Sequence, residues 1–201
     1  MQKLVAATAP PVLNDRSTPL SLLATRRSGR PRDLIAPGPS GDELARILAV
    51  AARTPDHGKL HPWRFVHVPR ERRPAFAELL HRAFRETDAT PRSAELEAVD
   101  RLAHQAPELV VALFSPRPSL KIPLWEQQLS CGAACMNLAH AAHAMGYAAG
   151  WVTGWPAYSD RVRDGFGAEP ERIAGLIYLG TPAVPLEERA RPELSEVVSS
   201  W

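Results

Sequence analysis

The chain has 201 residues, 45% of them hydrophobic and 23% charged, a balance typical of a single globular domain with a sizeable core. Its formal charge is only +2 and its basic and acidic residues are interspersed, so we expect no nucleic-acid partner. No apolar run approaches the ~18 residues of a membrane helix, so we expect no membrane partner. Two cysteines are too few for a disulfide scaffold, so we expect a location in the reducing cytoplasm.

The N-terminal part of the sequence predicts a flexible extension followed by a helix. Residues 1–17 have no real apolar stretch, so we expect them to extend from a single domain formed by residues 18–201. Thr18 can cap a helix whose first residue is Pro19, and this helix is predicted to run towards Arg26-Arg27-Ser28.

The next segments predict a second helix, a strand and two further helices. Ser40–Glu43 has the pattern of a capping box, and apolar residues follow it at helical spacing until Pro55 ends the helix. Trp63–Val68 is predicted to be a strand. The polar stretch Arg70–Gln105 predicts two solvated helices on the surface.

The second half of the chain supplies the rest of the predicted core. Glu108–Phe114 is nearly continuous in apolar residues, as in a strand buried on both faces. Pro123–Met145 predicts a long helix rich in small residues, in which Cys131 and Cys135 share one face and act as small core side chains. Two more strands are predicted at Ala148–Thr153 and Ile173–Leu179. About four strands that do not alternate strictly with helices favour an α+β fold.

Arg26, Arg27 and Ser28 are the first candidate binding residues. Two guanidinium groups and a hydroxyl can clamp a phosphate, because forked donors match its oxygens. The alternative is that these basic residues only cap the C-terminal end of a helix, where the macrodipole favours positive charge.

The loop between Pro55 and Trp63 is the second candidate. His57 and His61 can donate to a planar heteroaromatic ligand held on a rigid scaffold. They could also ligate a metal ion, although no cysteine lies nearby. A polar loop beside a packed tryptophan is the third interpretation.

The segment Gly150–Trp155 is the third candidate. Glycine on both sides of Trp151-Val152-Thr153 lets the backbone approach a ligand closely, so that its N–H and C=O groups can contact ring edges. The alternative is a strand end with a buried aromatic side chain. A separate dinucleotide-binding domain is not expected, because no G-x-G-x-x-G follows a strand and no Walker loop is present.

The order of these motifs resembles the nitroreductase family. The series consists of Arg-Arg-Ser, Pro-Asp-His…His-Pro-Trp, Trp-Glu before a small-residue helix, Gly-Trp-Val-Thr-Gly and Tyr-Leu-Gly-Thr-Pro, and it spans roughly Pro19 to Pro182. The resemblance implies a mostly antiparallel central sheet wrapped by helices. It also implies an intertwined homodimer with FMN at the subunit interface.

The resemblance also implies roles for the candidate residues. By position, the FMN phosphate and ribityl chain would be held by Arg26, Arg27 and Ser28. The flavin ring would be contacted by His57 and His61 of the partner subunit, and through the backbone by Trp151, Val152 and Thr153. Arg30 stands where some relatives place a lysine near the ring. The family often has Gln at the position of His61 and Arg-Ser at the positions of Val152-Thr153.

The activity that the resemblance implies is electron transfer from NADH or NADPH, through FMN, to a small oxidised organic molecule such as a nitroaromatic or a quinone. The hydride transfers would follow a ping-pong order, with no side chain acting as a nucleophile. Two alternatives remain: a flavin-binding protein without turnover, used for storage or sensing, and a flavin-free metal protein based on His57 and His61.

Overall fold

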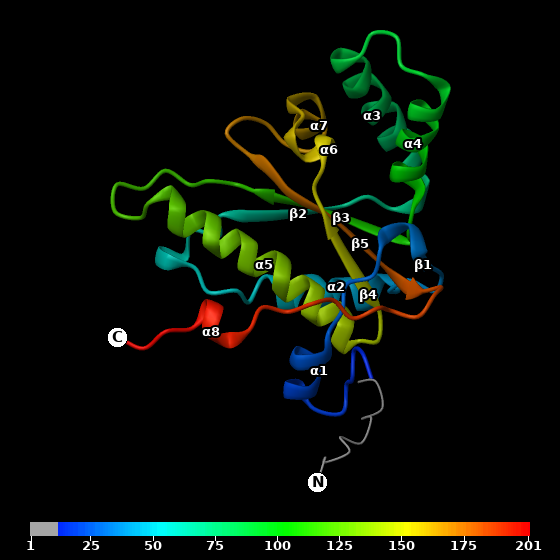
Figure 1. Ribbon diagram of the computed structural model, residues 1–201. Helices are drawn as coiled ribbons and strands as arrows, with labels where there is room; N and C mark the ends of the chain where they lie inside the picture. Colours follow the sequence, from blue (N-terminus) through cyan, green and yellow to red (C-terminus); the bar gives the residue numbers. More distant parts are fainter. Residues whose placement is uncertain (1–11) are drawn as a thin grey trace.

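The computed structural model describes residues 12–201, so the first eleven residues of the predicted N-terminal extension lie outside it (Figure 1). The strands are β1 (Leu34–Ile35), β2 (Trp63–His67), β3 (Glu108–Phe114), β4 (Ala148–Val152) and β5 (Arg172–Pro182). The helices are α1 (Pro19–Thr25), α2 (Gly41–Ala51), α3 (Arg73–Thr87), α4 (Ser93–His104), α5 (Leu124–Ala144), α6 (Trp155–Tyr158), α7 (Asp160–Asp164) and α8 (Leu194–Val197). Short 3-10 turns lie at Pro31–Asp33, His57–Lys59 and Arg70–Arg72.

The five strands form one sheet, in which all of the pairs between described residues are antiparallel. β5 is the longest strand because it pairs with three others: β3, β4 and, through its last two residues, β1. β2 pairs with β3 at the other side of the sheet. The predicted α+β class with a mostly antiparallel sheet is confirmed.

Helices cover both faces of this sheet, and β3 shows how its side chains divide between them. Leu109, Val111 and Leu113 point into a core built with α3, α4, α6 and α7. Val110 and Ala112 point the other way, into a core built with α2 and α5. The apolar run of β3 is nearly continuous because both of its faces are buried.

The helices on the second face begin and lie as the sequence predicts. Ser40 and Glu43 form the complete capping box at the start of α2. Cys131 and Cys135 are free thiols, 2% and 0% exposed, on the buried side of α5. Both small side chains therefore act in the core, which allows α5 to lie close to the sheet.

The prediction that Arg70–Gln105 forms two solvated helices was wrong about their solvation. α3 buries Phe76 and Leu80, and α4 buries Val99. Arg73 is only 2% exposed and donates hydrogen bonds from Nε to the carbonyl of Val68 and from Nη1 to that of Ala103. The outer faces of the two helices are charged, so the overall composition of the segment is polar although one side of each helix is buried.

Two further differences lie near the N-terminus. α1 ends at Thr25, before the predicted Arg-Arg-Ser terminus, because Asn14 binds the chain on both sides of that point. The Asn14 amide donates to the carbonyl of Thr25, and its Oδ1 accepts from the amide of Arg27. The two-residue strand β1 was not predicted.

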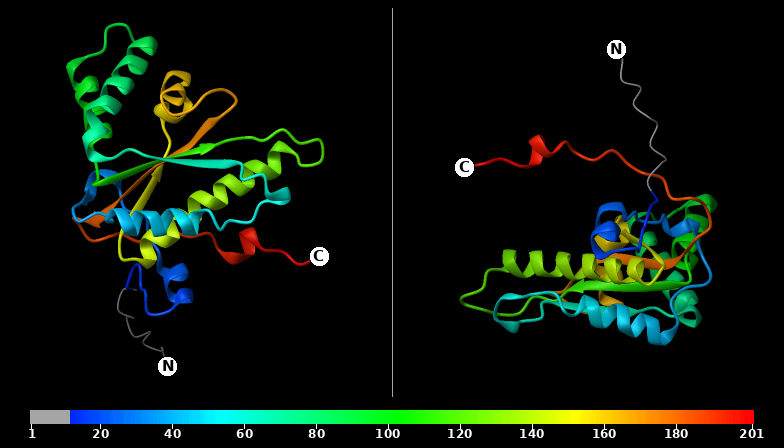
Figure 2. Two further views of the ribbon diagram at one scale, coloured as in Figure 1. Left: turned by 180° about the vertical axis from the view of Figure 1, so that it is seen from behind. Right: turned by 90° about the horizontal axis from the view of Figure 1, so that it is seen from below.

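The chain after β5 forms a C-terminal tail, residues 183–201, which begins against the domain and whose end, from α8 on, is exposed. Figure 2, in its right-hand view, shows this tail standing apart from the helices and the sheet. None of the residues of α8 is buried, and the tail exposes the apolar side chains of Leu194, Val197, Val198 and Trp201. Among residues 12–201, no helix has both the length and the apolar character needed to cross a membrane.

Candidate functional site

Arg26 lies directly after α1 and is partly buried. Its backbone is extended at φ −61° and ψ 135°, and within residues 12–201 its side chain makes no hydrogen bond or ion pair. Partial burial lowers the pKa of Arg26, and the positive charges of Arg191 and Arg27 lower it further. This position therefore gathers positive charge that an anion would stabilise.

Arg27 and Arg30 differ from Arg26 because both interact with Glu187 in the C-terminal tail. Arg27 donates from Nε to the carbonyl oxygen of Glu187 at 2.6 Å and lies 3.6 Å from the carboxylate of Glu188. Arg30 forms an exposed ion pair with Glu187 at 3.3 Å. Both arginines thus fasten the tail to the segment that follows α1.

Arg189 and Arg191 are candidate site residues that the sequence did not reveal. The positive charges of both residues lower the pKa of Arg26, and Arg191 also forms an ion pair with Glu188 at 3.0 Å. The Arg-Ala-Arg spacing in the tail is the signal that could have singled them out. The tail is held near Arg26 by the hydrogen bond between Arg27 and Glu187, which are 160 positions apart in the chain. No local sequence pattern predicts such a contact.

Two histidines at the C-terminal end of α5 border this basic group. His143 is fully buried, and neither ring nitrogen has a hydrogen-bond partner among the described residues. Burial, reinforced by Arg26 and His140, lowers the pKa of His143 to about 4. Burial and Arg26 lower the pKa of His140 in the same direction. Both rings are therefore neutral near pH 7 and add no positive charge.

The backbone that follows Arg26 lies against β4, and this brings two of the predicted groups together. Ser28 is exposed, and the amide of Gly29 donates to the carbonyl of Ala149 at 3.1 Å. A Cβ on Gly150 would lie 2.6 Å from the carbonyl oxygen of Gly29, so only glycine permits this close crossing. Arg26–Ser28 and Trp151–Thr153 therefore belong to one part of the chain's surface.

Trp151 lies flat on the sheet. Its indole Nε1 donates to the carbonyl of Ala174 at 3.1 Å, at the point where a β-bulge leaves Ala174 without a partner on β3. The indole covers Gly175, where any Cβ would collide with it. Trp151 is 38% exposed, Val152 is half-buried and Thr153 is exposed, so a ligand can reach the backbone of this strand end.

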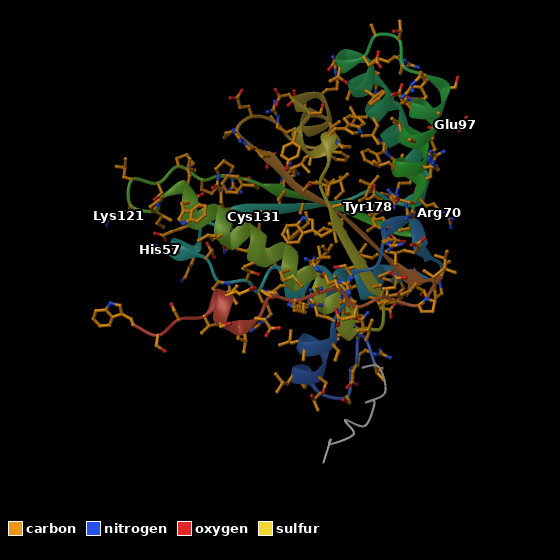
Figure 3. All side chains as sticks on the ribbon, viewed as in Figure 1. His57, Arg70, Glu97, Lys121, Cys131 and Tyr178 are labelled. Carbon is orange, nitrogen blue, oxygen red and sulfur yellow. The ribbon has the colours of Figure 1, made fainter. Side chains whose placement is uncertain are left out.

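His57 and His61 lie at the other end of α5, in the loop of residues 54–61, called here the histidine loop. Figure 3 shows His57 and Lys121 at the end of the molecule where α5 begins. His57 Nδ1 lies 2.8 Å from Glu126 Oε2, in the first turn of that helix. The edge of the His61 ring packs against Trp63, with the ring centroids 5.6 Å apart.

The predicted site residues thus form two groups in one chain. The charge of Arg26 lowers the pKa of His143. His57 instead pairs with Glu126, which lies 17 residues before His143 on the same helix. At 1.5 Å per residue, Glu126 and His143 are about 25 Å apart along α5. Within residues 12–201, no three His, Cys, Asp or Glu side chains come close enough to hold a metal ion.

The first group could hold a phosphorylated planar cofactor such as flavin mononucleotide. An arginine whose side chain makes no hydrogen bond within residues 12–201, a nearby hydroxyl and two tail arginines suit a phosphate dianion. The glycine crossing and the accessible strand end at Trp151–Thr153 suit the edge of a planar ring. His57 and His61 are exposed, so they are accessible to another chain.

Comparisons with known proteins show the family to which the chain belongs. The model of the nitroreductase family matches residues 23–181. A Haemophilus influenzae protein named "Putative NAD(P)H nitroreductase" is 36% identical over 174 residues, which cover 86% of this chain and 92% of that protein. The Escherichia coli K12 protein "Putative NAD(P)H nitroreductase YdjA" is 35% identical over 167 residues, covering 81% and 87%.

Solved structures share the fold at lower sequence identity. A nitroreductase-like family protein from Bacillus cereus superimposes with a TM-score of 0.78 at 22% identity, covering 92% of this chain and 96% of that one. The FMN and NADPH-dependent nitroreductase NfnB from Sphigopyxis sp. strain HMH superimposes with a TM-score of 0.73 at 18% identity, covering 92% and 99%.

Proposed function

The chain belongs to the nitroreductase family of oxidoreductases, and from this premise we propose that it binds FMN and passes electrons from NADH or NADPH to small oxidised organic molecules. Relatives named as NAD(P)H nitroreductases and the FMN-dependent structural neighbour support the cofactor and the reductant. The single observation that carries the proposal is Arg26, which has no hydrogen bond or ion pair within residues 12–201 and lies near three further arginines and beside an accessible strand end.

Arg26 and Ser28 are the proposed ligands of the FMN phosphate, with Arg191 and Arg189 approaching from the tail. Arg27 is proposed to contribute while it keeps its bond to the tail through Glu187. Each charge-assisted hydrogen bond to a phosphate oxygen stabilises the complex by about 1.5–3 kcal/mol. The tail thus couples cofactor binding to its own order.

The backbone of Trp151, Val152 and Thr153 is proposed to line the flavin ring. Backbone N–H groups fixed by strand pairing are preorganised donors, and donors of this kind stabilise negative charge that develops on a ring. Bound FMN would supply the redox chemistry, taking a hydride from NAD(P)H and delivering it to the acceptor in separate half-reactions. Arg30 is 62% exposed and pairs with Glu187, so we assign it no direct part.

We propose that the complete site needs a second copy of the chain. His57 pairs with Glu126, which lies about 25 Å along α5 from His143, the residue whose pKa Arg26 lowers. The proposed contact of His57 and His61 with the flavin therefore comes from the partner subunit. α5 also presents an exposed face that includes Trp125, Leu129 and Ala133. The apolar side chains of the C-terminal tail need a surface that its own chain does not supply.

The proposed location is the cytoplasm, whose reducing conditions keep thiols such as Cys131 and Cys135 free.

Absorbance spectroscopy tests this function. The purified protein is expected to bind FMN, to lose the flavin absorbance band when NADH or NADPH is added without oxygen, and to regain it when a quinone is added. Flavin that stays oxidised in the presence of both nucleotides would instead favour a storage or sensing protein. Protein that binds no FMN would contradict the proposal.

A further inference from the structure

We propose that Glu126 is a positioning residue that holds the imidazole of His57 as a proton donor to the acceptor molecule, an inference that rests on the proposed function. The two side chains come from different parts of the chain, with Nδ1 of His57 and Oε2 of Glu126 2.8 Å apart. To act as a proton donor, His57 must be held in place and must keep one ring nitrogen free. The reaction must also consume a proton.

The histidine loop is fastened along one stripe of α5. Asn137 donates from Nδ2 to Oγ1 of Thr54 at 2.7 Å, and Ser130 donates from Oγ to the carbonyl of Pro55 at 2.9 Å. Glu126 is the third residue of this stripe. The spacing 126, 130, 137 places all three on one side of a helix, so together they lay the start of the loop along α5.

The backbone of the loop is strained where it passes His57. Two residues other than glycine have positive φ, 56° at Lys59 and 49° at His61. The amide of His61 donates to Oδ2 of Asp56 at 2.9 Å, which holds this turn. A non-glycine residue in this region costs on the order of 1 kcal/mol and persists when its surroundings hold it, commonly at functional sites.

The pairing leaves the other edge of His57 available. Its side chain is 61% exposed, and within residues 12–201 its hydrogen bonding to protein is through Nδ1 alone. A carboxylate on Nδ1 keeps a proton on that nitrogen and fixes the ring orientation. Nε2 then points away from Glu126 and can carry the proton that is transferred.

The proposed reaction needs such a proton. A quinone that receives a hydride originating from NADH or NADPH becomes a hydroquinone only when one proton is added to oxygen. A nitro group that receives a hydride and one proton gives a nitroso group and water. In this step the Nε2–H bond of His57 breaks and an O–H bond forms on the acceptor, and the neutral imidazole then recovers its proton from water.

A comparison of two acceptors separates proton donation from electron transfer. A quinone consumes protons, whereas ferricyanide accepts single electrons and no proton. The holoenzyme would be assayed with both acceptors as wild type, Glu126→Gln and His57→Gln. The control is Glu97→Gln, which changes an exposed carboxylate on α4, at the opposite side of the molecule in Figure 3.

We expect the ratio of quinone turnover to ferricyanide turnover to fall by tenfold or more in Glu126→Gln and His57→Gln, since general acid catalysis contributes about 10²–10⁴ in rate. The control should keep the wild-type ratio. Nitrogen NMR of the His57 ring supplies a readout independent of turnover: the proton sits on Nδ1 in the neutral wild-type ring and distributes over both nitrogens in Glu126→Gln.

Equal loss with both acceptors, or an unchanged ratio, would overturn the proposal, because either result leaves Glu126 with no more than a structural role. An unchanged tautomer in Glu126→Gln would overturn the positioning role. Wild-type protein that reduces neither acceptor would contradict the proposed function itself, and that failure is visible before any variant is compared.

Discussion

Arg26 shows at the scale of one residue how the fold prepares an anion site. The end of α1 leaves it in extended backbone, and Arg191 from the tail and Arg27 bring like charges to it. Like charges held together destabilise the unliganded state, and a bound dianion relieves that repulsion. The anion binding that we propose at Arg26 would therefore be linked to the order of the tail.

Replacing Arg26 by Met should weaken FMN binding by at least tenfold, because about 1.5–3 kcal/mol is lost with one charge-assisted hydrogen bond. Titration of flavin fluorescence with the purified protein measures this change. Arg32→Met is the matched control, since Arg32 is 73% exposed and has only a 3.9 Å contact with Asp33. Equal affinities for the wild type and Arg26→Met would remove Arg26 from the phosphate site.

His143 makes the stability of the fold depend on pH. Its pKa falls from an ordinary 6.5 to about 4 because the ring is buried and lies near Arg26 and His140. Between these two pH values the unfolded chain binds a proton that the folded chain does not. The free energy of unfolding should therefore decrease as the pH falls from 6.5 to 4, by up to about 3 kcal/mol from this residue.

His143→Leu should flatten this pH dependence in urea unfolding experiments between pH 4 and pH 6.5. Neither ring nitrogen has a partner among the described residues, so the apolar side chain costs no hydrogen bond seen there. His104→Leu changes an exposed histidine on α4 and should leave the slope as in the wild type. A slope that persists in His143→Leu would assign the effect to other groups.

At the scale of elements, α5 connects the proposed functional parts. Its buried side carries small residues such as Cys135 and Ala134 against the sheet. One edge holds the histidine loop through Glu126, and its far end borders Arg26 through His143. Its remaining face exposes Trp125 and is the face that we propose to meet the partner subunit.

Ala133→Arg should disrupt this interface, because burying an unpaired guanidinium against an apolar surface costs several kcal/mol. Sedimentation equilibrium should show a dimer for the wild type and a shift towards monomer for the variant. Ala98→Arg makes the same change at an exposed site on α4 and should remain dimeric. A dimer of unchanged strength in Ala133→Arg would place the interface elsewhere.

The elements that were predicted correctly are those with local signals. The capping box at Ser40 and the apolar run of β3 depend on near neighbours in sequence. The end of α1 was predicted too late because Asn14, eleven positions before Thr25, holds the chain there. The buried stripe of α3 was missed because charged residues, among them Arg73, Arg82 and Glu86, are spread along the whole helix and give it a polar composition.

The candidate site was predicted in its parts and not in its assembly. The motif order identified Arg26 and His57, but it could not show that α5 separates them. Arg191 was missed because it reaches Arg26 only through the fold of the tail. The pair of His57 with Glu126 joins residues 69 positions apart, and no spacing rule predicts such a contact.

At the scale of the whole molecule, each chain carries the two parts of the proposed flavin site near opposite ends of α5. The basic half has its own strand end at Trp151, and the histidine loop projects at the other end of α5. A two-fold dimer would bring each half against its complement and so form two equivalent sites. The central claim is therefore that FMN is held between two chains.

Flavin binding by a mixed dimer tests that claim most directly. One chain would carry Arg26→Met and the other His57→Ala together with His61→Ala, with different affinity tags to purify the heterodimer. Either homodimer should bind FMN poorly, whereas the heterodimer should hold roughly one FMN, since one of its two equivalent sites combines both intact halves. A heterodimer that binds no more FMN than either homodimer would show that each site lies within one chain.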